Sequence, residues 1–250
     1  METQAIGFGH FLGHADILAK GLLVVLLLMS IVTWCLIVSK SLQALILKRR
    51  ALRFLHTFWD APSVDAVATR LEQHHPDDPF SHLAWHGIVA ARHHQQHGAS
   101  KLDEAGTAVD FLTRAMRRVI DEETARFESG LTVLASIGST APFVGLFGTV
   151  WGVYHALVAI GMSGQGTLDK VAGPVGEALI MTALGLAVAI PAVLAYNAFV
   201  RSNRVVLSKL DAFAHDLFAV LTTGSRVSSP GTVLPLKMPT AATAATATRG

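Results

Sequence analysis

Charged residues are scarce in this chain of 250 residues. Asp, Glu, Lys and Arg make up 15% of it, whereas soluble domains usually carry about 25%. Cysteine occurs once, as Cys35, so an intramolecular disulfide is excluded. The net charge is only +2 and the sequence has no basic face interleaved with aromatics, which gives no support for nucleic-acid binding. Catalytic triads, phosphate loops and zinc-protease helices are absent as well, so we expect neither an enzyme nor a bound cofactor.

Long uncharged stretches are what the sequence has instead. Crossing a bilayer takes about 20 helical residues, and three stretches without Asp, Glu, Lys or Arg reach that length: 21–39, 129–168 and 178–200. The middle stretch is too long for one span, and we expect its helix to cross from about Gly138 to Ile160 and to end in the Gly-rich turn 161–166. The predicted fold class is an all-α membrane protein with three transmembrane helices.

Basic residues set the expected orientation, because cytoplasmic segments carry an excess of Lys and Arg. They cluster in 40–53 and 201–209, while the opposite side holds only Lys20 and Lys170. The amino terminus should therefore lie outside and the carboxyl terminus in the cytoplasm.

We expect the helix that precedes the second span to run into it without interruption. The predicted division is an outer segment 1–20, a first span 21–39, a cytoplasmic helical domain 40–128, a second span with its cytoplasmic extension 129–161, an outer loop 162–173, a third span 174–200, a cytoplasmic helix 201–224 and a disordered tail 225–250.

Small residues form a stripe along one face of the second span and of the third, because they recur at alternating steps of four and three residues. Such stripes allow close packing of helices in a membrane. They could also line an axial cavity, into which the two threonines would offer hydroxyl groups, and both interpretations can hold in an oligomer. The residues concerned are Gly145, Thr149, Gly152 and Ala156 in the second span and Ala178, Thr182, Gly185 and Ala189 in the third.

Glu177 is the single charged residue between 172 and 200. An ionised carboxylate is costly in a membrane interior, so an acid in a span is by default a candidate functional group, here for handling protons. The alternative is a carboxylate that reaches water at the outer interface. Glu177 does not share a helix face with Thr182, and no second carboxylate lies in the spans, which suggests that a partner helix supplies one.

Seven histidines fall between His74 and His97. His82 and His86 are four residues apart on a predicted helix and could in principle bind one metal ion. No cysteine or fixed finger spacing accompanies them, so we expect solvent-exposed histidines and no metal site.

The spans resemble those of the MotA/TolQ/ExbB proton-channel family. The resemblance covers about 129–201 and rests on the run 137–152, Ile-Gly-Ser-Thr-Ala-Pro-Phe-Val-Gly-Leu-Phe-Gly-Thr-Val-Trp-Gly, and on 174–179, Pro-Val-Gly-Glu-Ala-Leu, followed by Gly185, by Ala-Ile-Pro-Ala at 189–192 and by Tyr196 and Asn197. Towards the amino end, 14–17, 32–34, 39–41 and 48–50 are more similar to the ExbB branch of the family than to the TolQ branch.

This resemblance implies a multi-pass subunit of the bacterial inner membrane that forms a pentameric ring around transmembrane helices of ExbD. Such a complex uses the proton-motive force to drive TonB and thereby the outer-membrane uptake of iron-siderophores, haem or cobalamin. By position, Glu177 matches the family's essential acid, and Thr149 and Thr182 match the threonines that face an ExbD aspartate. Two alternatives stay open: a TolQ-type subunit that serves outer-membrane integrity, and a non-conducting membrane scaffold in which Glu177 is structural.

Overall fold

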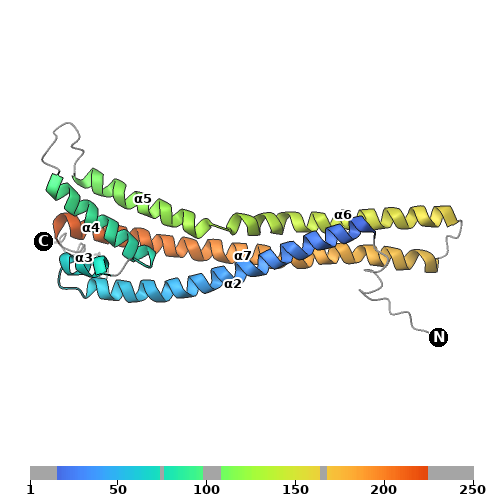
Figure 1. Cartoon of the computed structure of the whole chain (residues 1–250), viewed down its shortest axis with the longest axis horizontal. Helices are drawn as coiled ribbons and strands as arrows, with labels where there is room; N and C mark the ends of the chain where they lie inside the picture. Colours follow the sequence, from blue (N-terminus) through green and yellow to red (C-terminus); the bar gives the residue numbers. More distant parts are fainter. Residues whose placement is uncertain (1–15, 74–75, 98–107, 164–167, 225–250) are drawn as a thin grey trace, which may run out of the picture.

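The molecule is built on three long helices that lie side by side (Figure 1). A computed structural model describes residues 16–73, 76–97, 108–163 and 168–224, and all regular secondary structure in these ranges is helical. The long helices are α2 (Ile17–Trp59), α6 (Leu131–Ser163) and α7 (Leu168–Thr223), and the shorter α3 (Val64–Gln73), α4 (Pro79–His97) and α5 (Ala108–Glu128) gather at one end. The expected tail 225–250 and most of the expected outer segment 1–20 lie outside the described residues.

The lengths of the helices separate a membrane part from a part beyond it. At 1.5 Å per residue, the 43 residues of α2 and the 56 residues of α7 extend about 65 Å and 84 Å, against about 30 Å for the hydrocarbon core of a bilayer. Three helical segments, one each in α2, α6 and α7, are long and apolar enough to cross a membrane. The protein is therefore an all-α membrane protein whose α2 and α7 continue well past the bilayer.

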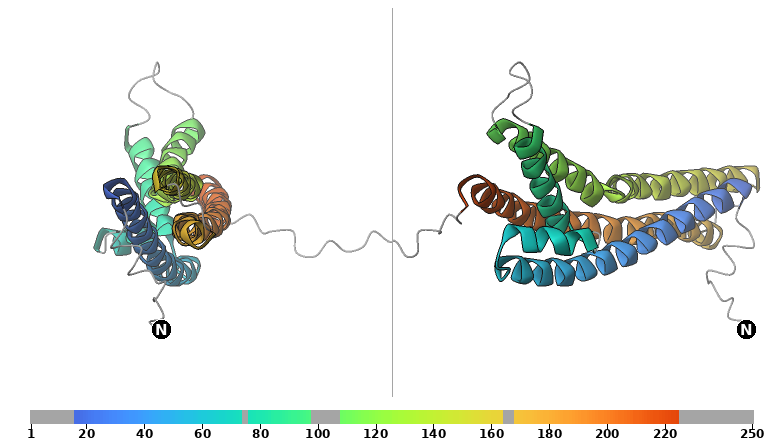
Figure 2. Two further views of the ribbon diagram at one scale, coloured as in Figure 1. Left: turned by 90° about the vertical axis from the view of Figure 1, so that its right-hand side faces the viewer. Right: turned by 60° about the vertical axis from the view of Figure 1, so that its left-hand side comes forward.

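The chain bends sharply between α5 and α6, where we expected one uninterrupted helix. That expectation is wrong: α5 ends at Glu128, and Gly130 adopts a left-handed backbone conformation with φ of 77°. Glycine adopts this conformation without the steric cost that a Cβ atom brings. A Cβ atom at Gly130 would also lie 3.3 Å from Leu36 of α2. Figure 2 shows the bend from a second direction.

The end of α5 at this bend is held by both of the other long helices. Lys40 Nζ of α2 donates a hydrogen bond to the carbonyl oxygen of Phe127 at 3.3 Å, and Asn203 Nδ2 of α7 donates to the same oxygen at 2.9 Å. The last carbonyl groups of a helix lack partners within the helix and need external donors. One carbonyl oxygen thus joins α5 to α2 and α7 at a level where the uncharged spans end.

Two separate hydrophobic cores lie along the length of the molecule. The membrane core joins α2, α6 and α7, and its most buried side chains are Leu26, Leu134, Ala141, Met181 and Ala192. The second core joins the far ends of α2 and α7 to α3, α4 and α5. Phe213 of α7 lies at its centre, with ring centroids 5.1 Å from Phe58 and 5.7 Å from Phe80. The unbroken helix α7 contributes to both cores.

Candidate functional site

Helices α6 and α7 approach most closely where glycines of one face the backbone of the other. A Cβ atom added to Gly145 would lie 2.6 Å from the carbonyl oxygen of Met181, and one added to Gly185 would lie 3.0 Å from the Cα atom of Gly145. A Cβ atom added to Gly152 would meet that of Ala178 at 2.9 Å. There is no room for a side chain at any of these three positions. Close contact between small residues is a common way to pack helices in membranes, where apolar attraction does not drive association.

The remaining small residues of the two stripes are buried as well. Ala156, Ala178 and Ala189 are 8%, 3% and 4% exposed. The small-residue stripes of α6 and α7 therefore face each other within one chain, as the packing interpretation requires. A cavity-lining role stays a prediction, and it now concerns mainly the two threonines, which are only partly buried.

Thr149 and Thr182 meet in the middle of this close contact. Their hydroxyl groups are in hydrogen-bond contact with each other, and both residues are partly buried. Thr149 Oγ1 also lies 3.1 Å from the carbonyl oxygen of Gly145 and 3.2 Å from that of Ala178. A hydroxyl group donates one hydrogen and accepts others. Thr149 thus has three acceptor oxygens for one hydrogen, so its donor can be redirected without movement of the backbone.

Glu177 occupies a helical position in α7, next to Ala178, and its side chain is outside the described part of the structure. Because Ala178 lies against Gly152, residue 177 is level with the same segment of α6 as the small-residue contact. Thr182 lies about 7.5 Å farther along the helix axis at 1.5 Å per residue. The structure thus brings the two threonines together and places the acid on the same helix, between the threonines and the start of α7.

His155 and Asp16 form a polar contact that sequence reasoning did not find. His155 Nε2 of α6 lies 3.8 Å from the carboxylate of Asp16, the residue that precedes α2, and the His155 ring centroid lies 4.4 Å from that of Trp151. The residues are far apart in the chain, and no local spacing connects them. The contact joins the start of α2 to α6.

His82 contradicts the expectation that the histidine-rich segment is exposed to solvent. Its side chain is 17% exposed, and its Nδ1 lies 2.8 Å from Glu123 Oε1 of α5. Among the described residues, no group of three or more His, Cys, Asp or Glu side chains could hold a metal ion. The buried partner Glu123 is 41 residues away in the sequence, so helical periodicity alone could not reveal it.

Comparison with known proteins gives the family. Residues 85–212 match the MotA/TolQ/ExbB proton channel family. The chain belongs to this family. It is 46% identical over 207 residues to the biopolymer transport protein ExbB of Xanthomonas campestris pv. campestris (strain B100), an alignment that covers 82% of each chain. It is 44% identical to the ExbB protein of Neisseria meningitidis serogroup A over 79% of this chain and 89% of that protein. The Tol-Pal system protein TolQ of Pseudomonas aeruginosa is 31% identical over 84% of this chain and 90% of that protein.

Proposed function

We propose that this chain is the proton-conducting subunit of an ExbB-type complex in the bacterial inner membrane. Its 46% and 44% identity to ExbB proteins, against 31% to a TolQ protein, supports the ExbB branch over the Tol-Pal system. The amino terminus lies outside and the carboxyl terminus in the cytoplasm. Five copies form a ring around transmembrane helices of ExbD, and the complex drives TonB-dependent uptake of iron-siderophores, haem or cobalamin.

The contact between the hydroxyl groups of Thr149 and Thr182 is the observation that carries this proposal. Large apolar side chains cover much of the outside of α6 and α7 in the membrane, and Phe143, Phe147, Val150, Leu186 and Ile190 are each more than 40% exposed. Against this apolar surface, two adjoining hydroxyl groups form a polar point that a partner carboxylate could use for hydrogen bonding. An ionised carboxylate is costly inside a membrane when no counter-charge lies nearby. Because a hydroxyl group can both donate and accept a hydrogen bond, the two threonines can bind the partner's carboxyl group in either protonation state.

Glu177 is the proposed titratable group of this chain. It exchanges a proton with the outer side of the membrane. The ExbD aspartate is the second group that carries the proton, and it binds at the threonine pair. Proton passage then requires a partner acid as well, because the spans of this chain contain no second carboxylate. The same requirement explains why the chain works as a complex.

The test is growth under iron limitation of a strain that lacks its own ExbB and ExbD, supplied with this chain and its cognate ExbD. We expect rescue by the wild type and no rescue by Glu177→Gln at equal abundance, with the complex still recovered by co-purification with ExbD. Thr149→Val should lower growth because it removes a hydroxyl group at nearly constant volume. Thr140→Val is the matched control, since Thr140 is exposed on the same helix and its hydroxyl group only donates to the carbonyl oxygen of Ser136.

Each outcome selects one function. Equal rescue by the wild type and Glu177→Gln would favour the scaffold, in which the acid is structural. A chain that fails to restore iron uptake but restores detergent resistance to a strain lacking TolQ would be a TolQ-type subunit. A loss of growth in Thr140→Val as large as that in Thr149→Val would refute the special place given to the threonine pair.

A further inference from the structure

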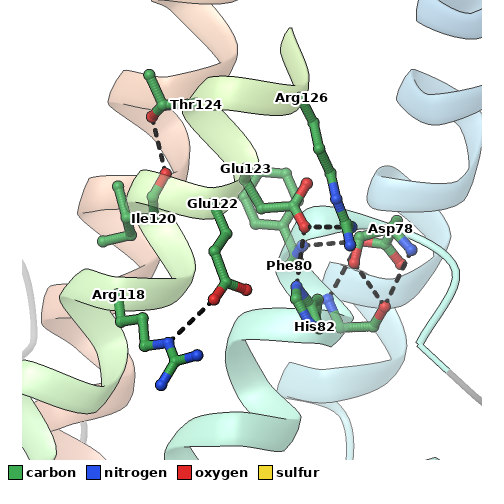
Figure 3. Close-up of polar contacts among 10 residues, drawn as sticks. Asp78, Phe80, His82, Arg118, Ile120, Glu122, Glu123, Thr124 and Arg126 are labelled. Carbon is green, nitrogen blue, oxygen red and sulfur yellow. Dashed lines mark hydrogen bonds and ion pairs between the residues drawn. The ribbon is translucent and has the colours of Figure 1, made fainter.

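A buried carboxylate joins α4 to α5 in the part of the molecule beyond the membrane (Figure 3). The side chain of Glu123 is 5% exposed, and its Oε1 accepts hydrogen bonds from His82 Nδ1 of α4 and from Arg126 of α5, both at 2.8 Å. A carboxylate oxygen only accepts, so Nδ1 of His82 carries a hydrogen. Burying a charged group is costly unless it is paired, and Glu123 obtains one of its two partners from the other helix.

A second histidine stands directly beside this pair. The ring of His86, one helical turn along α4, lies edge-on to that of His82 with centroids 4.7 Å apart. Across the contact, α5 presents Glu122, whose carboxylate accepts a hydrogen bond from Arg118 at 3.0 Å. A proton on His86 would therefore add a positive charge close to His82 and Arg118. The two acids, Glu122 and Glu123, already have arginine or histidine partners.

The other helices packed against α4 carry charges too. Arg50 of α2 pairs with Asp77, and Asp65 and Glu72 of α3 both pair with Arg92 at the far end of α4. Helix α7 adds Asp211, His215 and Asp216 to the same part of the molecule. At Gly87 of α4, the side chains that α7 brings closest are Leu217 and Leu221, which are apolar.

We propose that His86, whose ring lies against that of His82 where His82 binds Glu123, is a pH-sensitive latch that loosens the contact between α4 and α5 as the cytoplasm becomes more acidic. The placement of this latch on the cytoplasmic side rests on the proposed function and its orientation. The latch is separate from the threonine pair and Glu177. Its consequence is that a proton influx large enough to acidify the cytoplasm would loosen the extramembrane domain of the subunit that admits the protons.

The sign of the pH dependence follows from His86. Burial lowers the pKa of His86, the neighbouring His82 lowers it further, and Glu122 acts in the opposite direction. The latched state therefore favours the neutral ring, whereas an opened α4 binds the proton at the ordinary histidine pKa of about 6.5. Latching is favoured above that pH and weakens as the pH falls towards the lowered pKa. Uptake of one proton can change the equilibrium constant between the latched and the opened state by at most about tenfold per pH unit. Water around the largely exposed His86 ring reduces this change, so we expect the equilibrium constant for latching to fall by a few-fold in total.

The experiment measures amide hydrogen exchange of the full-length protein in lipid nanodiscs at pH 7.5 and pH 5.5. Exchange rates are converted to protection factors, which removes the pH dependence of the chemical step. We expect protection in α4 and α5 to fall a few-fold at pH 5.5 relative to the membrane parts of α6 and α7. His86→Gln should abolish most of this fall, and His215→Gln is the matched control because His215 is an exposed histidine of the same domain.

His82→Gln keeps a donor for Glu123 but removes the second imidazole, and it should reduce the fall without abolishing latching at pH 7.5. Unchanged protection in the wild type between the two pH values would overturn the proposal, and so would a fall in His86→Gln as large as in the wild type. The measurement uses no transport. A failure of the iron-uptake test would therefore leave the latch standing, and flat protection would leave the proposed function standing.

Discussion

Replacing Gly185 with alanine tests whether the backbones of α6 and α7 must touch. The added Cβ atom would lie 2.7 Å from the carbonyl oxygen of Ala141 and 3.0 Å from the Cα atom of Gly145, where ordinary contacts begin at 3.4 Å. Both obstacles are backbone atoms and cannot rotate away, so the helices must separate by about 0.7 Å at this point. Overpacking of this kind costs about 1–3 kcal/mol, and the better helix propensity of alanine offsets up to about 1 kcal/mol of it. We expect a net loss of about 1–2 kcal/mol.

The same separation should disturb the threonine pair, because Thr182 lies one helical turn from Gly185. We therefore expect Gly185→Ala to lower both stability, measured by denaturant titration of the purified complex in detergent, and iron-limited growth. Gly176→Ala is the matched control on α7, since a Cβ atom there meets nothing within 4 Å. A Gly185→Ala protein as stable as the wild type would refute the close contact, because alanine would then have found room that the structure does not provide.

Two further predictions concern the bend between α5 and α6, and both are checked by the same denaturant titration. Gly130→Ala should destabilise the protein by about 1 kcal/mol through its left-handed backbone, and Gly130→Asn should cost less because asparagine tolerates that conformation. Asn203→Leu should cost about 1–2 kcal/mol by removing one of the donors that hold the end of α5, whereas the exposed Asn197→Leu should be nearly neutral. Equal effects of Asn203→Leu and Asn197→Leu would show that the bend does not depend on this hydrogen bond.

Much of the membrane part could be predicted from the sequence, because spans are defined by local properties. The lengths of the uncharged stretches predict three helices that can cross a bilayer. The steps of four and three residues predict that Gly145 and Gly152 share one face of α6 and that Gly185 lies on the small-residue face of α7. Periodicity says which residues share a face but not what covers that face. It therefore left packing and cavity lining open, and only the coordinates of α7 against α6 show that these glycines are covered within the chain.

The contacts that sequence reasoning missed join residues that are far apart in the chain. The sequence assigns Lys40 to the basic cluster that sets the topology, yet its ammonium group also donates a hydrogen bond to the end of α5. The histidine-rich segment is expected to be exposed because no metal-ligand spacing accompanies it, yet His82 contacts the buried Glu123. Gly130 alone carried a local signal, since a glycine between two helical patterns can mark a break, but the apolar run that follows it favoured one continuous helix.

The position of that break determines how the two cores are connected. Helix α7 passes from Thr182 in the membrane to Phe213 in the second core as one helix, although Pro191, which has no N–H group, leaves out one hydrogen bond of the backbone ladder. The path through α5 and α6 is interrupted at Gly130 and is tied to α2 and α7 by the donors on the carbonyl oxygen of Phe127. Helix α7 therefore joins the membrane core to the second core directly, whereas α6 is connected to α5 and its buried Glu123 only through the bend.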